Sequence, residues 1–258
     1  PYHGNTERRS YCRMVRVADG WMSPPFGFGL HMGNAFVHGD RLYVTAVDDH
    51  KTVRPYLYII ETEDMVRWSA PRTIFGGPEW RIHNSTLCRT DAGKFVLGVE
   101  CDHPAGLFAM FFAESDDLRE FRYLPDALYG PGYTGGPILR SFGEYCYLFY
   151  ITGDYDSEFV LNVSRSRDLR RWTPSLCNPI LQPDDAEDRK IYPGVTIPEA
   201  ERRRMLAARN INVSDIDFCD WRGKLAINYS WGDQKGTEFL ALAEADADER
   251  KFCESYFA

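Results

Sequence analysis

An aspartate followed four residues later by an aromatic side chain occurs at four places along this chain. The pairs are Asp64/Trp68, Asp117/Phe121, Asp168/Trp172 and Asp248/Phe252. Their spacings are 53, 51 and 80 residues, and the last becomes 51 if the 29 residues 182–210 form an insertion. A period near 50 residues that contains several short strands is typical of a β-propeller, in which each repeat is one blade. The repeat therefore excludes most other all-β architectures.

Short apolar runs that alternate with turn residues supply the strands of each predicted blade. The last unit has runs at 211–219, 224–231 and 238–245, separated by Trp221-Arg222-Gly223 and by 232–236. The earlier units are predicted at 35–38, 41–47, 56–62 and 70–75; at 85–89, 94–101, 107–113 and near Tyr123; and at 138–141, 145–151, 159–164 and 179–182. Residues 1–33 are irregular, with a single predicted strand at 11–17.

The insertion at 182–210 is predicted to contain the only helix of the chain. Thr196 and Glu199 have the spacing of a capping box, and residues 197–209 are rich in good helix formers. We interpret the run Arg202-Arg203-Arg204 as a solvated helix face rather than a binding patch.

Composition limits the partners and the compartment. The 258 residues carry a net charge of −8, which argues against nucleic acid or an anionic membrane surface as a partner. No apolar run approaches the roughly 20 residues that span a bilayer. The seven cysteines are scattered, without a C-x-x-C pair, so we expect reduced core thiols, no metal site and no cofactor. We expect one cytoplasmic domain over residues 1–258, with secretion as the alternative because the chain begins at Pro1 without a methionine.

Propeller geometry predicts which side chains meet at the mouth of the central channel, where first strands start and second strands end. These positions hold His31, Asn34, Asp48, Asp49, Arg81, His83, Asn84, Glu100, Asp102, His103, Asp154, Asp215, Asp233, Gln234 and Glu238. Trp21, Trp80, Tyr133 and Trp231 flank them. Polar groups beside aromatic platforms suit a carbohydrate, which offers hydroxyls to the former and CH faces to the latter. We therefore predict an oligosaccharide or glycoside as the ligand.

The units that end in Ser115-Asp116-Asp117-Leu118 and in Arg167-Asp168-Leu169-Arg170-Arg171-Trp172 resemble those of glycoside hydrolase family 43 and its relatives in families 32, 62 and 117. The segments 31–37 and 212–217 and the closing 254–257 look like a branch of that superfamily. The resemblance covers about residues 30–258. It implies an all-β, five-bladed propeller, of which four blades are complete here and the fifth is partial.

The resemblance also implies catalytic positions. Family members often begin a first strand with Asp-Pro, eight residues before the glycine that opens the second strand, and Asp215 stands eight before Gly223. The other three slots hold Asn34, Ser85 and Gly136, so the usual Asp, Asp, Glu triad is displaced.

The expected activity is inverting hydrolysis of a glycosidic bond, with Asp215 as the base and Glu100 or His83 as the acid. His31, Asn34 and Asp217 would orient the substrate or tune Asp215, and the three tryptophans would stack on sugar rings. Arg81, Gln234 and Glu238 complete the predicted binding residues. Two alternatives stay open: a non-catalytic sugar-binding propeller, and a glycan phosphorylase or transferase whose anion pocket would use Arg54 and Arg81.

Overall fold

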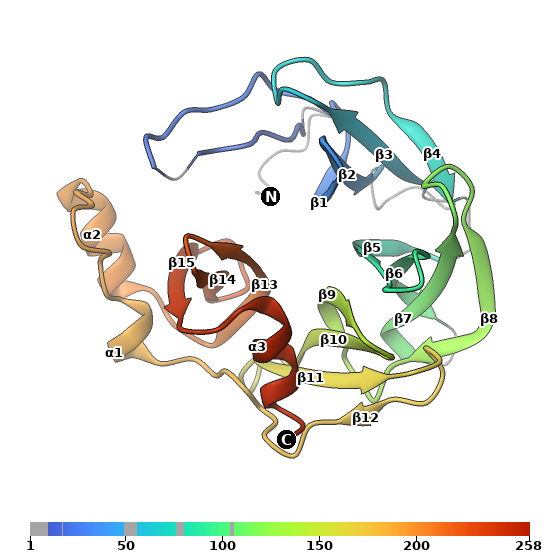
Figure 1. The fold of residues 1–258 in the computed structure, drawn as a ribbon. Coiled ribbons are helices and arrows are strands. Elements are labelled where there is room, and N and C mark those ends of the chain that lie inside the picture. The colour runs from blue at the N-terminus through green and yellow to red at the C-terminus, as the bar shows by residue number, and fades with distance from the viewer. Residues whose placement is uncertain (1–9, 17, 49–55, 76–79, 104–105) are drawn as a thin grey trace.

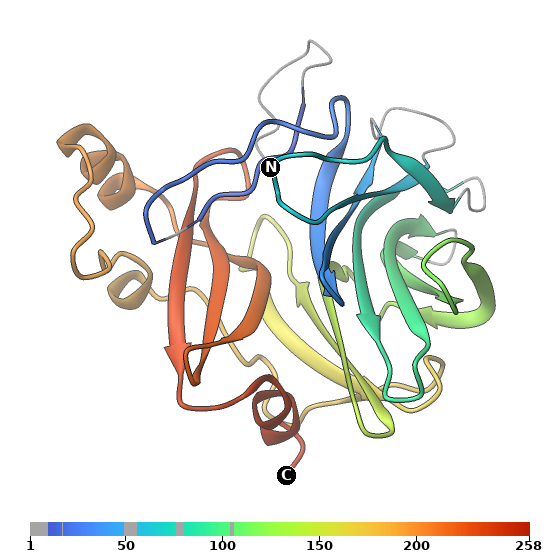
Figure 2. The same ribbon diagram turned by 45° about the horizontal axis from the view of Figure 1, so that its top comes forward.

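The computed structural model describes residues 10–16, 18–48, 56–75, 80–103 and 106–258, which form four antiparallel sheets around a common axis (Figure 1, Figure 2). The first sheet contains β1 (His31–His38), β2 (Arg41–Val47), β3 (Leu57–Thr62) and β4 (Arg72–Phe75). The second contains β5 (Ile82–Arg89), β6 (Phe95–His103), β7 (Gly106–Ser115) and β8 (Arg122–Tyr129). The third contains β9 (Gly135–Phe142), β10 (Tyr145–Thr152), β11 (Val160–Ser166) and β12 (Thr173–Pro174). The fourth contains β13 (Asn212–Trp221), β14 (Lys224–Gly232) and β15 (Glu238–Ala245).

The arrangement confirms the all-β propeller. In each sheet consecutive strands are neighbours, and the inner strands β1, β5, β9 and β13 contact one another in that order around the axis. Apolar side chains such as Leu97, Phe111, Leu148 and Phe149 are fully buried between sheets. This packing explains why strands with two buried faces appear in the sequence as nearly continuous apolar runs.

Five blades are not seen. The described residues form four sheets, and residues 10–16 and 18–30 run without a sheet of their own through the sector between β15 and β1 (Figure 1). The strand predicted at 11–17 is reduced to isolated bridges that join Cys12 to Phe26 and Val15 to Met22. Phe26 stacks on Trp68 with ring centroids 3.5 Å apart, which anchors this segment to the first sheet.

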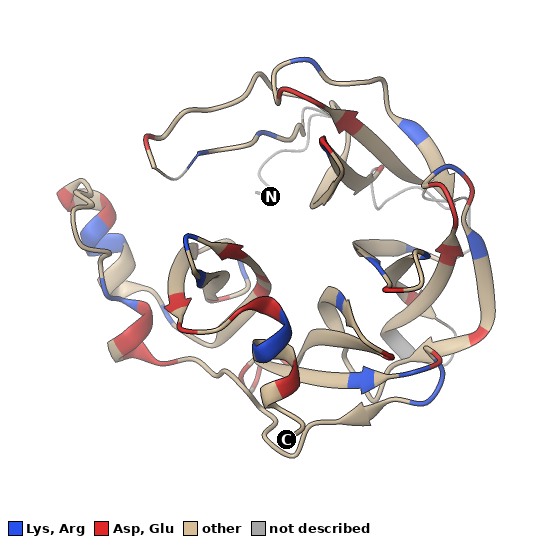
Figure 3. Ribbon diagram, in the orientation of Figure 1, with Lys and Arg blue, Asp and Glu red and all other residues tan. Residues whose placement is uncertain are grey.

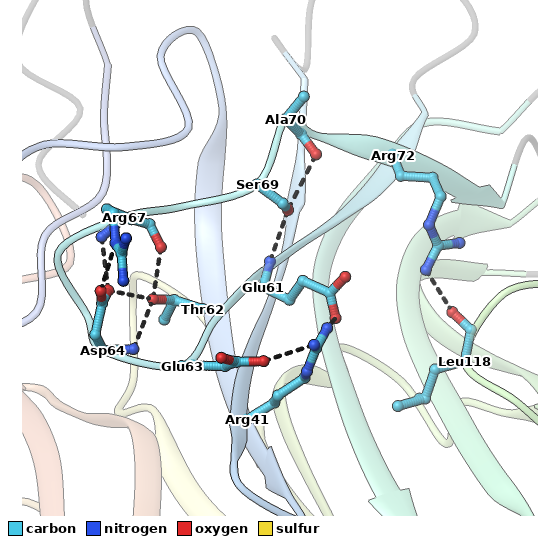
Figure 4. A network of polar contacts seen from close by, with 10 residues as sticks. All are labelled: Arg41, Glu61, Thr62, Glu63, Asp64, Arg67, Ser69, Ala70, Arg72 and Leu118. Carbon is cyan, nitrogen blue, oxygen red and sulfur yellow. Dashed lines mark hydrogen bonds and ion pairs between the residues drawn. The ribbon is translucent and has the colours of Figure 1, made fainter.

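The repeated aspartates close the same turn in three blades. Asp64 Oδ1 accepts a hydrogen bond from the amide of Val66 at 2.9 Å. It also accepts one from the amide of Arg67 at 2.7 Å (Figure 4). Asp117 and Asp168 accept from the amides two and three residues ahead in the same way. The residue after each aspartate has a left-handed φ of 55° to 62°. Such side-chain caps favour Asp at turns, which accounts for the repeat.

The fourth member of the repeat is different. Asp248 is the N-cap of a helix, α3 (Glu249–Ser255), and accepts a hydrogen bond from the amide of Lys251. The aromatic that follows, Phe252, packs on Phe149 with ring centroids 5.8 Å apart. The aspartate therefore caps a helix here instead of a turn that leads to a fourth strand.

The insertion contains two helices, so the prediction of one helix in the chain was wrong. They are α1 (Asp185–Asp188), capped by Asp184, and α2 (Glu199–Ala207). The capping box at Thr196 is also wrong, because the N-cap is Pro198 and has no side-chain hydrogen bond. The proline ring clashes with helical backbone angles at the residue before it, and this keeps Ile197 outside the helix.

The strand predicted at 179–182 was likewise wrong. The fourth strand of the third sheet is β12, and residues 179–182 contribute only an isolated bridge from Leu181 to Leu161. Proline lacks the amide hydrogen that a strand ladder uses, and Pro179 and Pro183 flank this segment.

Charged residues of both signs lie along α2 and α3 (Figure 3). Arg203 and Arg204 pair with Glu199 and Glu201 on exposed turns of α2, as expected of a solvated face. No helix among the described residues is long and apolar enough to cross a membrane.

All seven cysteines are free, and their burial differs. Cys88, Cys101, Cys146 and Cys253 are buried, whereas Cys177 and Cys219 are exposed and Cys12 is intermediate. The expectation that all seven are core residues was therefore wrong for Cys12, Cys177 and Cys219.

We expect a thiol reagent added to the native protein in non-reducing buffer to modify Cys177 and Cys219 first, with Cys12 slower. The four buried thiols should react only after denaturation, because the reagent must reach the sulfur. The measurement is a timed titration before and after guanidinium. A total below seven would indicate a disulfide and would count against a cytoplasmic location.

Candidate active site

The same irregularity marks the start of all four inner strands. In β1, β5, β9 and β13, two residues face a single residue of the next strand, as in a β-bulge. The first residues of the four bulges are Met32, His83, Gly136 and Asp215. Met32, Gly136 and Asp215 have left-handed φ values of 53°, 56° and 50°. The residues structurally equivalent to Asp215 are therefore Met32, His83 and Gly136. The glycine spacing predicted Gly136 correctly, but it predicted Asn34 and Ser85 in place of Met32 and His83.

Glu100 is the residue that faces the bulge of β5. Its side chain is 2% exposed, and Oε2 accepts hydrogen bonds from Asn84 Nδ2 at 2.8 Å and from the amide of Gly136 at 3.0 Å. Burial raises the pKa of Glu100 to about 7, although both hydrogen bonds act in the opposite direction. Nearby Asp215 and Asp102 add a smaller upward contribution. A carboxyl in this state carries its proton close to neutral pH.

The two hydrogen bonds also determine which oxygen carries that proton. Both donors point at Oε2, so in the neutral acid Oε2 is the acceptor and Oε1 holds the hydrogen. Oε1 lies 3.5 Å from the point where a Cβ on Gly135 would be. The ring of Tyr133 lies 3.0 Å from the same point, so the absence of a side chain at Gly135 leaves space beside the acidic hydrogen.

Asp215 lies against the second glycine of the same pair. Its side chain is exposed, and its Oδ1 lies 3.4 Å from the Cβ position of Gly136. The amide nitrogen and Cβ position of one residue are about 2.5 Å apart, so Glu100 Oε2 and Asp215 Oδ1 lie within about 9 Å of each other. The structure thus brings together a buried carboxyl and an exposed one from different blades.

His83 and Arg81 are held by another acid. His83 is 9% exposed, and its Nε2 lies 3.0 Å from Oδ1 of Asp102. Arg81 lies 3.9 Å from Oδ2 of the same carboxylate, so it does not pair with Glu100. The ring of His83 also packs against Phe108 at 5.0 Å. Arg54, the other residue considered for an anion pocket, and Asp49 lie outside the described residues.

Gln234, Glu238 and Tyr133 gather around Asp215. Gln234 donates to Asn212 at 2.7 Å, and Asn212 leads through Ser214 to the Asp215 carboxylate. Burial first, and then the charge of Asp215, raises the pKa of Glu238. Burial likewise raises the pKa of Tyr133, with added contributions from Glu100 and Asp215.

Four of the predicted binding residues do not have the expected environment. Trp231 is 1% exposed and stacks on Phe239, so it has no free face for a sugar. Trp80 packs edge to face on Phe111 and Tyr123, inside the second blade. Trp21 lies under the guanidinium of Arg16. Asp217 forms an ion pair with the largely buried Arg140 at 2.6 Å. The burial of Trp231 corrects its predicted stacking role, whereas Trp21, Trp80 and Asp217 are partly exposed and their roles stay predictions.

Arg140 joins Asp217 to the neighbouring blade through an ion pair. The guanidinium also pairs with Glu249 at 2.7 Å and lies over the ring of Phe218. The bulge at Asp215 separates the two aspartates, so Asp217 serves the contact between β9, β13 and α3.

His31 and Asn34 bracket the bulge of β1, and His31 Nε2 lies 3.2 Å from Ser10 Oγ.

Several residues of this site escaped prediction from the sequence. Asn212 and Ser214 precede Asp215 within one strand, and Gly135-Gly136 comes two residues after Tyr133; the sequence assigned none of the four a role in the site. A glycine pair in the middle of a run that starts an inner strand was the available signal, since glycine in a strand marks a bulge or a close approach. No trio of His, Cys, Asp or Glu within the described ranges is placed to hold a metal ion.

Comparison with known proteins was made by sequence and by structure. No protein-family model matches the chain, and no curated protein matches it in sequence. Solved structures do match. Xylan β-1,4-xylosidase from Bacillus halodurans C-125 superimposes with a TM-score of 0.60 at 15% identity, over 86% of this chain and 42% of that one. The family 32 β-fructofuranosidase of Bombyx mori gives 0.59 at 14% identity, over 95% and 50%. The family 43 endo-arabinanase of Bacillus licheniformis gives 0.56 at 11%, over 86% and 75%.

The chain has the fold of the family 43 and family 32 propellers. This confirms the all-β propeller implied by the sequence resemblance but not its fifth blade. The propeller described here spans less than half the length of the first of these structures.

Proposed function

We propose that this propeller is a glycoside hydrolase that inverts the anomeric centre, with Asp215 as the base and Glu100 as the acid. The observation that carries the proposal is a buried carboxyl with a pKa raised to about 7, within about 9 Å of an exposed carboxyl. A separation of at most about 9 Å is compatible with the roughly 6.5–9.5 Å of an inverting pair, which leaves room for one water, and also with the roughly 5–5.5 Å of a retaining pair. The choice of inversion therefore rests on the resemblance to family 43, and the anomer assay below decides it.

The two environments favour different roles. Exposed Asp215 is open to the solvent water that it would deprotonate, whereas Glu100 is shielded and keeps its proton. In the reaction a water gives a proton to Asp215 and its oxygen bonds to the anomeric carbon. The bond from that carbon to the leaving oxygen breaks, and the leaving oxygen takes the proton from Oε1 of Glu100. Each carboxyl then returns to its starting state by exchange with solvent.

Two further points support a carbohydrate ligand. The solved structures that share the fold include a xylosidase, an endo-arabinanase and a β-fructofuranosidase. Tyr133, half-buried beside Glu100 and Asp215, would add an aromatic edge to the site, with part of its ring packed on Phe108 and Phe159. The ring of five blades implied by the resemblance would be completed in the sector where residues 10–16 and 18–30 run.

A non-catalytic sugar-binding propeller is the second candidate, favoured by Met32 and Gly136, which bring no acid to the positions equivalent to Asp215. For a phosphorylase or transferase, Arg81 would have to bind an anion while it lies 3.9 Å from the Asp102 carboxylate.

The proposal is tested with 4-nitrophenyl glycosides of arabinofuranose, xylose, galactose and fucose in both anomeric forms. We expect release of nitrophenol from at least one, and proton NMR of the first sugar formed should show the opposite anomer. Retention of configuration would contradict the inverting pair. Binding of a sugar without hydrolysis of any member of the set would favour the second candidate.

A further inference from the structure

A chain of three hydrogen bonds ends on the Asp215 carboxylate. Gln234 Nε2 lies 2.7 Å from Asn212 Oδ1, Asn212 Nδ2 lies 2.9 Å from Ser214 Oγ, and Ser214 Oγ lies 3.0 Å from Asp215 Oδ2. Asn212 is fully buried and Ser214 is 2% exposed. Gln234 comes from the loop after β14, where it has a left-handed φ of 55°.

The direction of every bond in this chain follows from chemistry. A carboxylate only accepts, so the single hydroxyl hydrogen of Ser214 points at Asp215. Ser214 Oγ is then left to accept from the amide of Asn212, whose oxygen accepts from Gln234. All three donors are oriented toward the carboxylate, and aligned hydrogen bonds polarise one another.

The surroundings of Asp215 create a need for such support. Glu100 on β6, Glu238 at the start of β15 and Tyr133 before β9 all interact electrostatically with Asp215. None of these groups becomes positively charged, and Glu238 repels Asp215 when both are ionised. The backbone of Asp215 is also left-handed, a conformation that residues with a side chain adopt less readily than glycine. An exposed carboxylate in this position is free to swing into solvent unless something holds it.

We propose that Ser214, Asn212 and Gln234 are positioning residues that hold the Asp215 carboxylate in the orientation required for deprotonating water. The inference rests on the proposed function, because it assumes that Asp215 is the base. It adds that an exposed base is aimed by a buried donor chain and not by direct contact with the substrate.

The test compares crystal structures and kinetics of the wild type and Ser214→Ala, using the nitrophenyl glycoside that the wild type hydrolyses. We expect the Asp215 carboxylate to occupy more than one conformer, or a rotated one, in the variant. We also expect kcat to fall about 10- to 100-fold with KM within twofold, because a misplacement of about 1 Å suffices for such a loss. Ser214→Thr keeps the hydroxyl and should restore both the conformer and kcat.

Ser166→Ala is the matched control, since Ser166 is equally buried and donates to Asp168 in a turn that is not part of the site. It should leave kcat unchanged. Gln234→Ala serves if Ser214→Ala does not fold, and should displace Asp215 in the same sense by a smaller amount. An Asp215 carboxylate that stays in place in the folded variant overturns the inference, whatever the kinetics. Absence of turnover in the wild type overturns the proposed function alone, because the crystallographic comparison still tests the positioning.

Discussion

Asp215→Asn is expected to lower kcat for glycoside hydrolysis by about 10²–10⁴-fold, the usual contribution of a general base. Asparagine keeps the size of the side chain and an oxygen that can accept from Ser214, but it cannot take a proton from water. The fold should survive, because the side chain is exposed and has no ionic partner within the described residues. The measurement is steady-state hydrolysis of the best nitrophenyl glycoside.

Asp117→Asn is the matched control for this prediction. Asp117 is an exposed aspartate whose oxygen accepts two amides in a turn of the second blade, and asparagine preserves that role. We expect its kcat to stay within twofold of the wild type. Activity of Asp215→Asn within tenfold of the wild type would contradict the assignment of the base.

The loss of activity in Glu100→Gln should depend on the leaving group of the substrate. A general acid matters most when the departing oxygen is basic, so the loss should approach about 10²–10⁴-fold for an unsubstituted disaccharide and should be much smaller for a dinitrophenyl glycoside. The pH profile provides a second readout. Wild-type kcat/KM should fall above pH 7, because the pKa of Glu100 is raised to about 7 by its burial. In the Glu100→Gln variant kcat/KM should no longer fall above pH 7. If it falls there as in the wild type, Glu100 is not the acid.

Glu100 also makes a prediction that needs no substrate. The pKa of Glu100 is about 7 in the folded protein against an ordinary 4.5, so the unfolded chain releases this proton first as pH rises. The free energy of unfolding should therefore fall between about pH 4.5 and pH 7, by up to about 3 kcal/mol, and level off above that range. Urea titrations of the wild type and Glu100→Gln measure the difference. An equal pH dependence in the two proteins would mean that Glu100 is already ionised in the folded state.

The parts of the site that interact across blades could not be obtained from strand patterns. Glu100 was predicted at the mouth because it ends a second strand, but its burial depends on the bulge of β5 and on the amide of Gly136 in the next blade. The same holds for Trp231. Its place at the end of β14 suggested an exposed ring, whereas packing on Phe239 buries it. A pattern with period two says which face a side chain occupies and not what covers that face.

What the sequence determined by itself is local. The turns at Asp64, Asp117 and Asp168 depend on a side chain that caps amides two and three residues ahead, so a repeat of single residues sufficed to predict the propeller. Only the tertiary structure decided that Arg140 pairs with Asp217 and that Gly136 brings Asp215 and Glu100 together. Each of these depends on contacts between residues distant in the chain, whose energies are set by burial and charge that no single strand contains.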